Sequence, residues 1–183
     1  FSSQSMTTQI HVNRAPLTVT ADHQTKIYGA PDPKLTFKAI GIQAAAGDTE
    51  ATALCGALER AIGSNVAKYA INLGTLATTS NYAAVFTGNT LDITAAPLSI
   101  TANDATKAYG QATTFAGTEF TVGVGQLQDV DKIASVTLTS DGAAAGAAAG
   151  PHAIVPSVAV GGGLTKLTNY NITYSPGTLT INK

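Results

Sequence analysis

The chain contains the same stretch of sequence twice, and this repetition limits the folds open to it more than any other feature. Ala15-Pro-Leu-Thr-Val-Thr-Ala-Asp-His-Gln-Thr-Lys-Ile-Tyr-Gly29 returns as Ala96-Pro-Leu-Ser-Ile-Thr-Ala-Asn-Asp-Ala-Thr-Lys-Ala-Tyr-Gly110, an offset of 81 residues. At the ends of the two copies, Asn81-Tyr82 matches Asn169-Tyr170 and the offset has grown to 88. Self-similarity at a fixed period is typical of repeat arrays. We therefore expect two related modules, residues 15–95 and 96–183.

The junction between the modules occurs a third time, near the start of the chain. Ile10-His-Val12 stands 81 residues before Leu91-Asp-Ile93, and an Ala-Pro-Leu follows both. We therefore expect residues 1–14 to be the tail of a preceding repeat, with its last strand at residues 9–13. Residues 1–8 lack the basic region and apolar core of a signal peptide, so any export signal is expected outside this stretch.

Composition narrows the classes of function. Only 11% of the 183 residues are charged and the net charge is −1, so the basic surface that nucleic-acid binding needs is missing. No apolar run approaches the roughly eighteen residues of a membrane span. The single cysteine cannot form an internal disulfide. A Thr-rich, Lys-poor chain of this kind is typical of extracellular bacterial β-proteins.

Alternating apolar residues predict a β-rich first module. Leu17, Val19 and Ala21 alternate with threonines, which indicates a strand with one buried face. Similar segments predict strands at residues 35–40, 69–73, 82–86 and 91–93.

One helix is expected within the first module, over residues 49–62. Its predicted apolar stripe consists of Ala51, Leu54, Cys55, Leu58 and Ile62. Asp48 is the expected N-cap, and Gly63 is well placed as the C′ residue. The element order ββαβββ is that of a β-grasp, in which one helix lies across a small mixed sheet.

The second module repeats the flanks of the first but not its middle, and we expect it to be the more β-rich. Residues 133–139 favour a strand through their β-branched side chains. Residues 142–150 alternate runs of alanine with glycine and precede Pro151, which predicts a loop of small residues.

These features together resemble the MBG repeat family, the mostly bacterial β-grasp modules. The resemblance rests on Ala-Pro-Leu-Thr-Val-Thr-Ala-Asp, Lys-x-Tyr-Gly, Gly47-Asp48, Asn-Tyr and Gly-x-x-Leu-x-Ile, and it covers nearly all of residues 15–183. It implies two tandem β-grasp-like modules of a large secreted adhesin, similar to the filamentous-haemagglutinin-like proteins exported by two-partner secretion. It implies no catalytic centre, cofactor or metal, and it supplies no ligand.

Tyrosines are the candidate ligand-binding residues. The candidates for a sugar-stacking site are Tyr28, Tyr109, Tyr82 and Tyr170. The alternative is structural: Tyr28 and Tyr109, each in a Lys-x-Tyr-Gly with Lys26 or Lys107, pack over a turn that the glycine allows. The structural alternative is favoured, because a repeated turn is what the fold of each module requires.

Other reactive side chains lack a motif. Cys55 lies on the predicted apolar stripe and is expected to be an unreactive core thiol. His11, His23 and His152 have no partner pattern for catalysis, so an enzyme is not expected. Asp129-x-Asp131 does not supply the six to eight converging oxygens that calcium needs, and a metal site is not expected either.

Three functions compete at this level. The leading hypothesis is a structural segment of a secreted or cell-surface adhesin, its partners being neighbouring repeats, which extends or displays adhesive regions in attachment and biofilm. The short Ala-Pro junction predicts a stiff pair, which small-angle scattering would measure. The alternatives are a module that binds a polysaccharide or host glycan, and self-association through an exposed edge strand. Sugar sites usually need exposed aromatic platforms, and the absence of tryptophan weighs against the glycan hypothesis.

Overall fold

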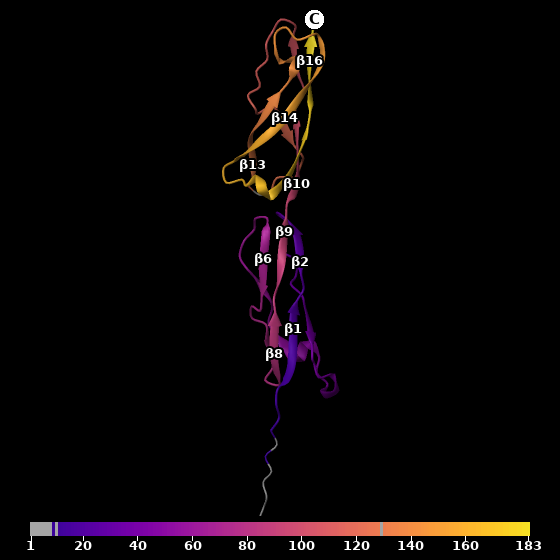
Figure 1. Cartoon of the computed structure of the whole chain (residues 1–183), viewed down its shortest axis with the longest axis vertical. Coiled ribbons are helices and arrows are strands. Elements are labelled where there is room, and N and C mark those ends of the chain that lie inside the picture. The colour runs from indigo at the N-terminus through magenta and orange to yellow at the C-terminus, as the bar shows by residue number, and fades with distance from the viewer. Residues whose placement is uncertain (1–8, 10, 129) are drawn as a thin grey trace, which may run out of the picture. The chain divides into compact units, whose positions relative to one another are not determined.

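A computed structural model gives the structure of residues 9, 11–128 and 130–183. The chain divides into two compact units (Figure 1). The first comprises residues up to Thr25, Asp32–Gly63 and Lys68–Asp92, and the second comprises Lys26–Pro31, Ser64–Ala67 and Ile93–Lys183. Most of the predicted tail at residues 1–14 lies outside the described residues. Its described part, residues 9 and 11–14, contains no strand, so the strand predicted at 9–13 is wrong for these residues, and residue 10 lies outside the described residues.

The first sequence repeat is built from short strands. They are β1 (Ala15–Ala21), β2 (Gln24–Ile27), β3 (Phe37–Ile40), β4 (Leu54–Cys55), β5 (Glu59–Arg60), β6 (Ala67–Asn72), β7 (Ala77–Thr78), β8 (Tyr82–Thr87) and β9 (Asn89–Thr94). A 3-10 turn, η1 (Ala44–Ala46), and one helical turn, α1 (Glu50–Ala53), lie between β3 and β4.

These strands form three sheets, of three, four and two strands. In the order β3-β1-β8, β1 is antiparallel to β3 and parallel to β8, with Leu17 opposite Ala84. The other sheets have the orders β2-β9-β6-β5 and β4-β7. The inward residues of β1, Leu17 and Val19, are 1% exposed and pack with Leu54 and Leu76. Alternation in the sequence thus predicted both the strand and its buried face.

The second sequence repeat has two long strands, β13 (Lys132–Thr139) and β14 (Gly150–Gly162), and, in its described part, no α-helix. Its other strands are β10 (Ala96–Ala102), β11 (Ala105–Ala108), β12 (Phe120–Val122), β15 (Tyr170–Ser175) and β16 (Gly177–Asn182), with 3-10 turns η2 (Asp141–Ala143) and η3 (Leu167–Asn169). The sheet order β12-β10-β15 repeats β3-β1-β8, again with a parallel pair.

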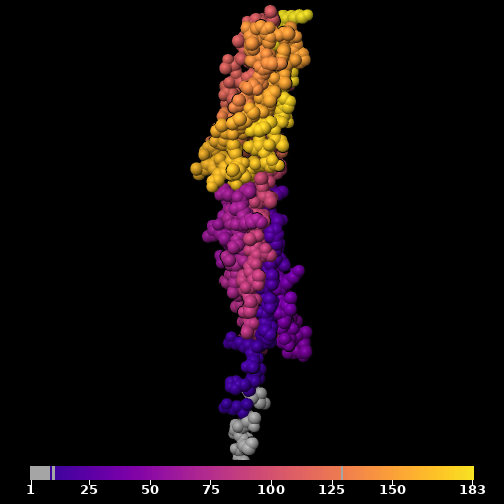
Figure 2. Space-filling model, in the orientation of Figure 1, coloured from indigo at the N-terminus to yellow at the C-terminus, as the bar shows by residue number. Residues whose placement is uncertain are grey.

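A long hairpin distinguishes the second repeat. β13 and β14 pair antiparallel in the sheet β11-β16-β14-β13, and orange residues of this hairpin form much of the visible surface of that repeat (Figure 2). The predicted strand at residues 133–139 and the loop at 142–150 are confirmed. The β-rich, β-grasp-like fold with one helix on mixed sheets is therefore confirmed as well.

The predicted helix at residues 49–62 is wrong in length, because only Glu50–Ala53 is helical. Asp48 is not its N-cap: the hydroxyl of Thr49 accepts from the backbone N–H of Thr52 instead. Glycine at position 56, in the middle of the predicted helix, has φ +90°, and a Cβ there would lie 2.1 Å from the carbonyl oxygen of Thr75. The chain leaves the helix at Leu54 because β4 pairs with β7, and the left-handed glycine closes off any return to helical geometry.

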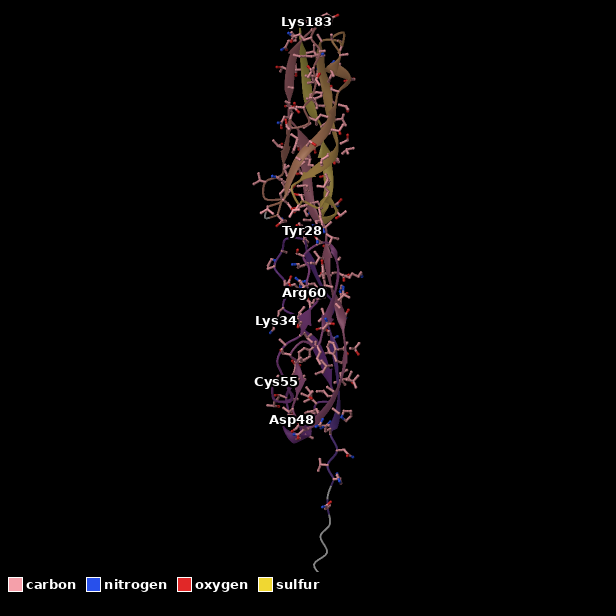
Figure 3. The ribbon with its side chains drawn as sticks, turned by 90° about the vertical axis from the view of Figure 1, so that its left-hand side faces the viewer. Tyr28, Lys34, Asp48, Cys55, Arg60 and Lys183 are labelled. Carbon is pink, nitrogen blue, oxygen red and sulfur yellow. The ribbon has the colours of Figure 1, made fainter. Side chains whose placement is uncertain are left out.

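The predicted stripe consequently does not share one face. Leu54 is buried and Leu58 is half-buried, whereas Ile62 is 98% exposed. Cys55 is also exposed (Figure 3), so the expectation of a core thiol is wrong. Successive side chains of a strand point to opposite faces, and Cys55 follows the inward Leu54 on β4.

Candidate functional site

The best-defined polar group of the first repeat is a pair between a tyrosine and an aspartate. Tyr82, the first residue of β8, is 2% exposed. Its hydroxyl donates to Oδ2 of Asp48 at 2.5 Å and accepts the backbone N–H of Gln43 at 2.9 Å. The hydrogen bond to Asp48 is the main cause that raises the pKa of Tyr82. The hydroxyl therefore stays protonated and acts as a donor.

The second repeat builds the same group from different surroundings. Tyr170, the first residue of β15, donates to Oδ2 of Asp131 at 2.6 Å and accepts the N–H of Gln128 at 3.0 Å. Burial, followed by the bond to Asp131, raises the pKa of Tyr170. This group cannot be recognised from the repeat alone, because glutamine and aspartate are five residues apart in the first repeat and three apart in the second. The signal that pointed to it was the repeated Asn-Tyr.

The Lys-x-Tyr-Gly turns are also structurally equivalent. Nζ of Lys26 donates to the carbonyl of Ala30 at 2.8 Å, and Nζ of Lys107 donates to that of Gln111 at 2.9 Å. Lys107 is 7% exposed and also donates to the carbonyls of Ala143 and Ala144. Each lysine therefore closes its turn by bonding the carbonyl four residues on.

The tyrosines of these turns differ in their surroundings. In the second compact unit, the hydroxyl of Tyr28 donates to Oδ2 of Asp131 at 2.9 Å. Its ring meets that of Tyr170 edge-on, with centroids 5.4 Å apart and planes at 80°. Tyr109, the equivalent residue of the second repeat, is 61% exposed. The structure thus brings Tyr28 and Tyr170 together on one aspartate and leaves Tyr109 at the surface.

An asparagine reinforces the Tyr28 contact. Asn169 is 1% exposed, and its side chain accepts the N–H of Val66 at 2.9 Å and donates to Oδ1 of Asn65 at 3.0 Å. Asn65 and Val66 lie in the segment Ser64–Ala67, and Tyr28 lies in Lys26–Pro31. Both segments come from the first sequence repeat but belong to the second compact unit. The compact unit therefore begins before the predicted boundary between residues 95 and 96.

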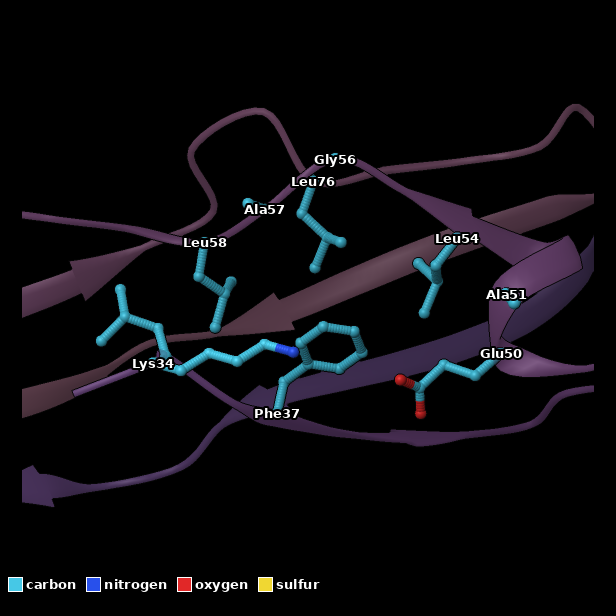
Figure 4. Close-up of a pocket in the computed structure, with 10 residues that line it drawn as sticks. Lys34, Phe37, Glu50, Ala51, Leu54, Gly56, Ala57, Leu58 and Leu76 are labelled. Atoms are coloured by element: carbon cyan, nitrogen blue, oxygen red, sulfur yellow. The ribbon is translucent and has the colours of Figure 1, made fainter.

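The first repeat also has an apolar pocket of about 470 Å³ (Figure 4). Phe37 and the side chain of Lys34 lie along one wall, and Leu58 and Leu76 reach in from the opposite side (Figure 4). Glu50 of α1 stands at one end. Two of its lining residues, Glu50 and Ala51, belong to α1, and Phe37 belongs to β3. Its lining combines an aromatic ring and leucines with one lysine and one glutamate.

The other residues considered for chemistry are dispersed. Among the described residues, no three His, Cys, Asp or Glu side chains are close enough to share a metal ion. Asp129 lies outside those residues, and Asp131 is bonded to Tyr28 and Tyr170. His152 lies on β14, with its Nδ1 atom 3.0 Å from Oδ1 of Asp141. Nε2 of His23 lies 3.3 Å from Oδ2 of Asp92.

Comparison with known proteins agrees with this geometry. The family model of the YGX-type MBG domain matches residues 17–92 and 98–180. The chain is a tandem pair of YGX-type MBG domains. Both matched ranges include a Lys-x-Tyr-Gly turn, at Lys26–Gly29 and Lys107–Gly110. No curated protein and no solved structure matches the chain significantly.

The family sets the general context of the MBG pair. MBG domains are repeat domains of extracellular bacterial proteins, including surface proteins. Within the described residues, the helices are all too short to cross a membrane.

Proposed function

We propose that the MBG pair is a non-catalytic segment of a secreted or cell-surface bacterial adhesin. Its repeats extend or display the adhesive regions of that protein in attachment and biofilm formation, and the parent protein is exported by two-partner secretion. The partners of each repeat are its neighbours in the same chain.

One observation carries the proposal. The hydroxyls of Tyr82 and Tyr170 are both bonded to an aspartate within the fold, in two repeats that otherwise differ in their middle. The recurring polar residues therefore position strands and turns. A repeat whose recurring side chains maintain its own architecture fits a role in spacing and display.

The proposal is tested on the parent protein in its own bacterium. We expect antibodies against residues 15–183 to label intact cells, and deletion of these residues to reduce attachment. Replacing them with another pair of MBG repeats of equal length should restore attachment. Failure of such an exchange, with the exchanged protein still displayed, would contradict a spacing role.

A glycan-binding module is the second candidate, and the pocket beside Phe37 and Lys34 favours it. An exposed Tyr109 also offers one aromatic ring to a sugar. A glycan array probed with the purified chain separates the two functions. Binding that Phe37→Ala or Tyr109→Ala abolishes would favour the glycan-binding function, and the exchange of repeats would then not restore attachment.

A further inference from the structure

The tyrosine–aspartate pair of the second repeat has a third member, whereas that of the first repeat has none among the described residues. Asp131 accepts from both Tyr170 and Tyr28. Among the described residues, Tyr82 is the one side chain that bonds to Asp48. Since the two pairs have the same donors and acceptors, the first repeat offers a second tyrosine a place that the described residues leave open.

The matching tyrosine is Tyr109. Its backbone N–H donates to the carbonyl of Asn182 at 2.8 Å, as that of Tyr28 donates to Thr94 at 2.8 Å. The following glycines have φ +81° at Gly29 and +87° at Gly110. The turns therefore present their tyrosines in the same way, yet Tyr28 packs against the core of the second unit and Tyr109 is 61% exposed.

The glycines of the two turns show the same difference. A Cβ at Gly29 would lie 2.2 Å from Oε1 of Gln128, whereas one at Gly110 would have nothing within 4 Å. Gln43 is the counterpart of Gln128, because each donates its backbone N–H to the buried tyrosine. Gln43 is exposed and Gln128 is half-buried.

A third pair of residues agrees. Asn169 is 1% exposed because Asn65 and Val66 cover it, whereas its sequence counterpart Asn81 is exposed. The alanine-rich loop of the second repeat takes the sequence position of Asn65. That loop therefore has no asparagine that could bond to a following repeat as Asn65 bonds to Asn169. The tyrosine of the Lys-x-Tyr-Gly turn is the part of the contact that both repeats possess.

Each repeat carries its buried tyrosine–aspartate pair at one end and the tyrosine of its Lys-x-Tyr-Gly turn at the other. In the second repeat, β10 and β11 run parallel to β15 and β16, with Ala96 beside Tyr170 and Ala108 beside Asn182. The buried tyrosine thus lies where β10 begins, and Tyr109 lies beyond the end of β11. A contact that joins one end of a repeat to the other end of the next is heterologous, so it can be repeated from one repeat to the next along an array.

We propose that Tyr109 docks on Asp48 and Tyr82 of a further MBG repeat of the same kind, its hydroxyl donating to Asp48 and Gly110 facing Gln43. The inference rests on the proposed role as part of a repeat array, and it assigns the side chains through which one repeat recognises the next. A second copy of this chain supplies the required partner.

The test is a fusion of residues 1–183 directly to a second copy of residues 15–183. Ala15 then follows Ile181 at the spacing by which Ala96 follows Ile93, so the natural junction is reproduced. Tyr109→Phe is introduced in the first copy, where a repeat follows it. The matched control is the same substitution in the second copy, where none follows, and circular dichroism verifies that both variants fold.

We expect the first-copy variant to lower the melting temperature of the repeat that holds Asp48 by about 3–8 °C, because a bond to a carboxylate is lost. The second-copy variant should shift melting by less than about 1 °C. Asp48→Asn in the second copy, combined with the first-copy Tyr109→Phe, should cost less than the sum of the single changes.

Equal melting of the two Tyr109 variants, or additive effects in the double variant, would overturn the docking contact. Neither result depends on display of the parent protein or on attachment. A failure of the proposed function would appear as unlabelled cells or unchanged attachment, and is therefore distinguishable from a failure of the contact.

Discussion

Tyr82 and Tyr170 each bring a hydroxyl into a buried position, where leaving it without a partner would be costly. Both repeats solve this with an aspartate and a backbone N–H, although the aspartates stand at different places in the sequence. The recurring Asn-Tyr is therefore a structural signature. As ligand-binding candidates, the four tyrosines remain a prediction, and Tyr109 is the one with a largely exposed ring.

Removing the hydroxyl of Tyr170 tests this account. Tyr170→Phe leaves the N–H of Gln128 without its acceptor and removes one donor from Asp131. We expect the free energy of unfolding to fall by about 1–3 kcal/mol, measured by urea denaturation. Tyr109→Phe in the same single chain is the control and should change stability by less than about 0.5 kcal/mol. An equal effect of the two substitutions would contradict the structural role.

His152 gives the second repeat a pH dependence. The carbonyl of Ala148 and the carboxylate of Asp141 raise the pKa of His152 above its ordinary 6.5, while burial and, to a smaller extent, the charge of Lys107 oppose them. When folding raises a pKa, the protonated group stabilises the folded state fully at pH values below the pKa of the unfolded state. This stabilisation is lost as the pH rises through the pKa of the folded state. We expect His152→Gln to lower the melting temperature at pH 5.5 by more than at pH 8.5. An equal loss at both pH values would show that the imidazole charge makes no contribution.

At the scale of elements, short strands replace the helix that the apolar spacing predicted. Gly56 sits in the middle of that spacing, and glycine costs about 1 kcal/mol relative to alanine inside a helix. The pairing of Leu54 with Thr78 and Cys55 with Ala77 supplies backbone hydrogen bonds that a continued helix would otherwise have provided. The local pattern of apolar residues favoured a helix, but pairing with β7, more than twenty residues away in the chain, makes this segment a strand.

The exposure of Cys55 gives this element a chemical test. We expect a thiol reagent to modify Cys55 in the folded chain at a rate within about tenfold of that in denaturant, since the exposed side chain is open to the reagent in both states. Leu54→Cys in a Cys55→Ser background provides the buried comparison, because Leu54 is 7% exposed. Protection of Cys55 as strong as that of the buried thiol would mean that β4 has the opposite orientation.

At the scale of the whole molecule, compact units and sequence repeats divide the chain differently. The second unit includes Lys26–Pro31 and Ser64–Ala67, which precede the second repeat by tens of residues. Tyr28 packs in that unit with its core, and Val66 covers the buried Asn169. A repeat excised at its sequence boundary therefore loses part of its own unit.

An excised second repeat should show this loss. We expect residues 96–183 alone to melt below the second unit of the whole chain, by about 4–8 °C for each kcal/mol lost with Tyr28 and Val66. Tyr28→Ala in the whole chain should reproduce part of the decrease. Calorimetry of the three proteins measures it, and identical melting of the fragment and the whole chain would show that the borrowed segments contribute nothing.

The sequence by itself determined the repeats, most of the strands and the family. Repetition and alternation are visible in the sequence without knowledge of tertiary partners, so the alternation of Leu17, Val19 and Ala21 indicates a strand whichever strands pair with it. The tertiary structure decided what depends on distant partners. Pairing with β7 makes part of the predicted helix the strand β4. Asp48 and Asp131 bond to tyrosines, although each lies at a different spacing from its glutamine. Tyr28 and Tyr109 lie in equivalent turns but have different surroundings. A residue's burial depends on what packs against it, and for Tyr28 that partner lies about a hundred residues away in the chain.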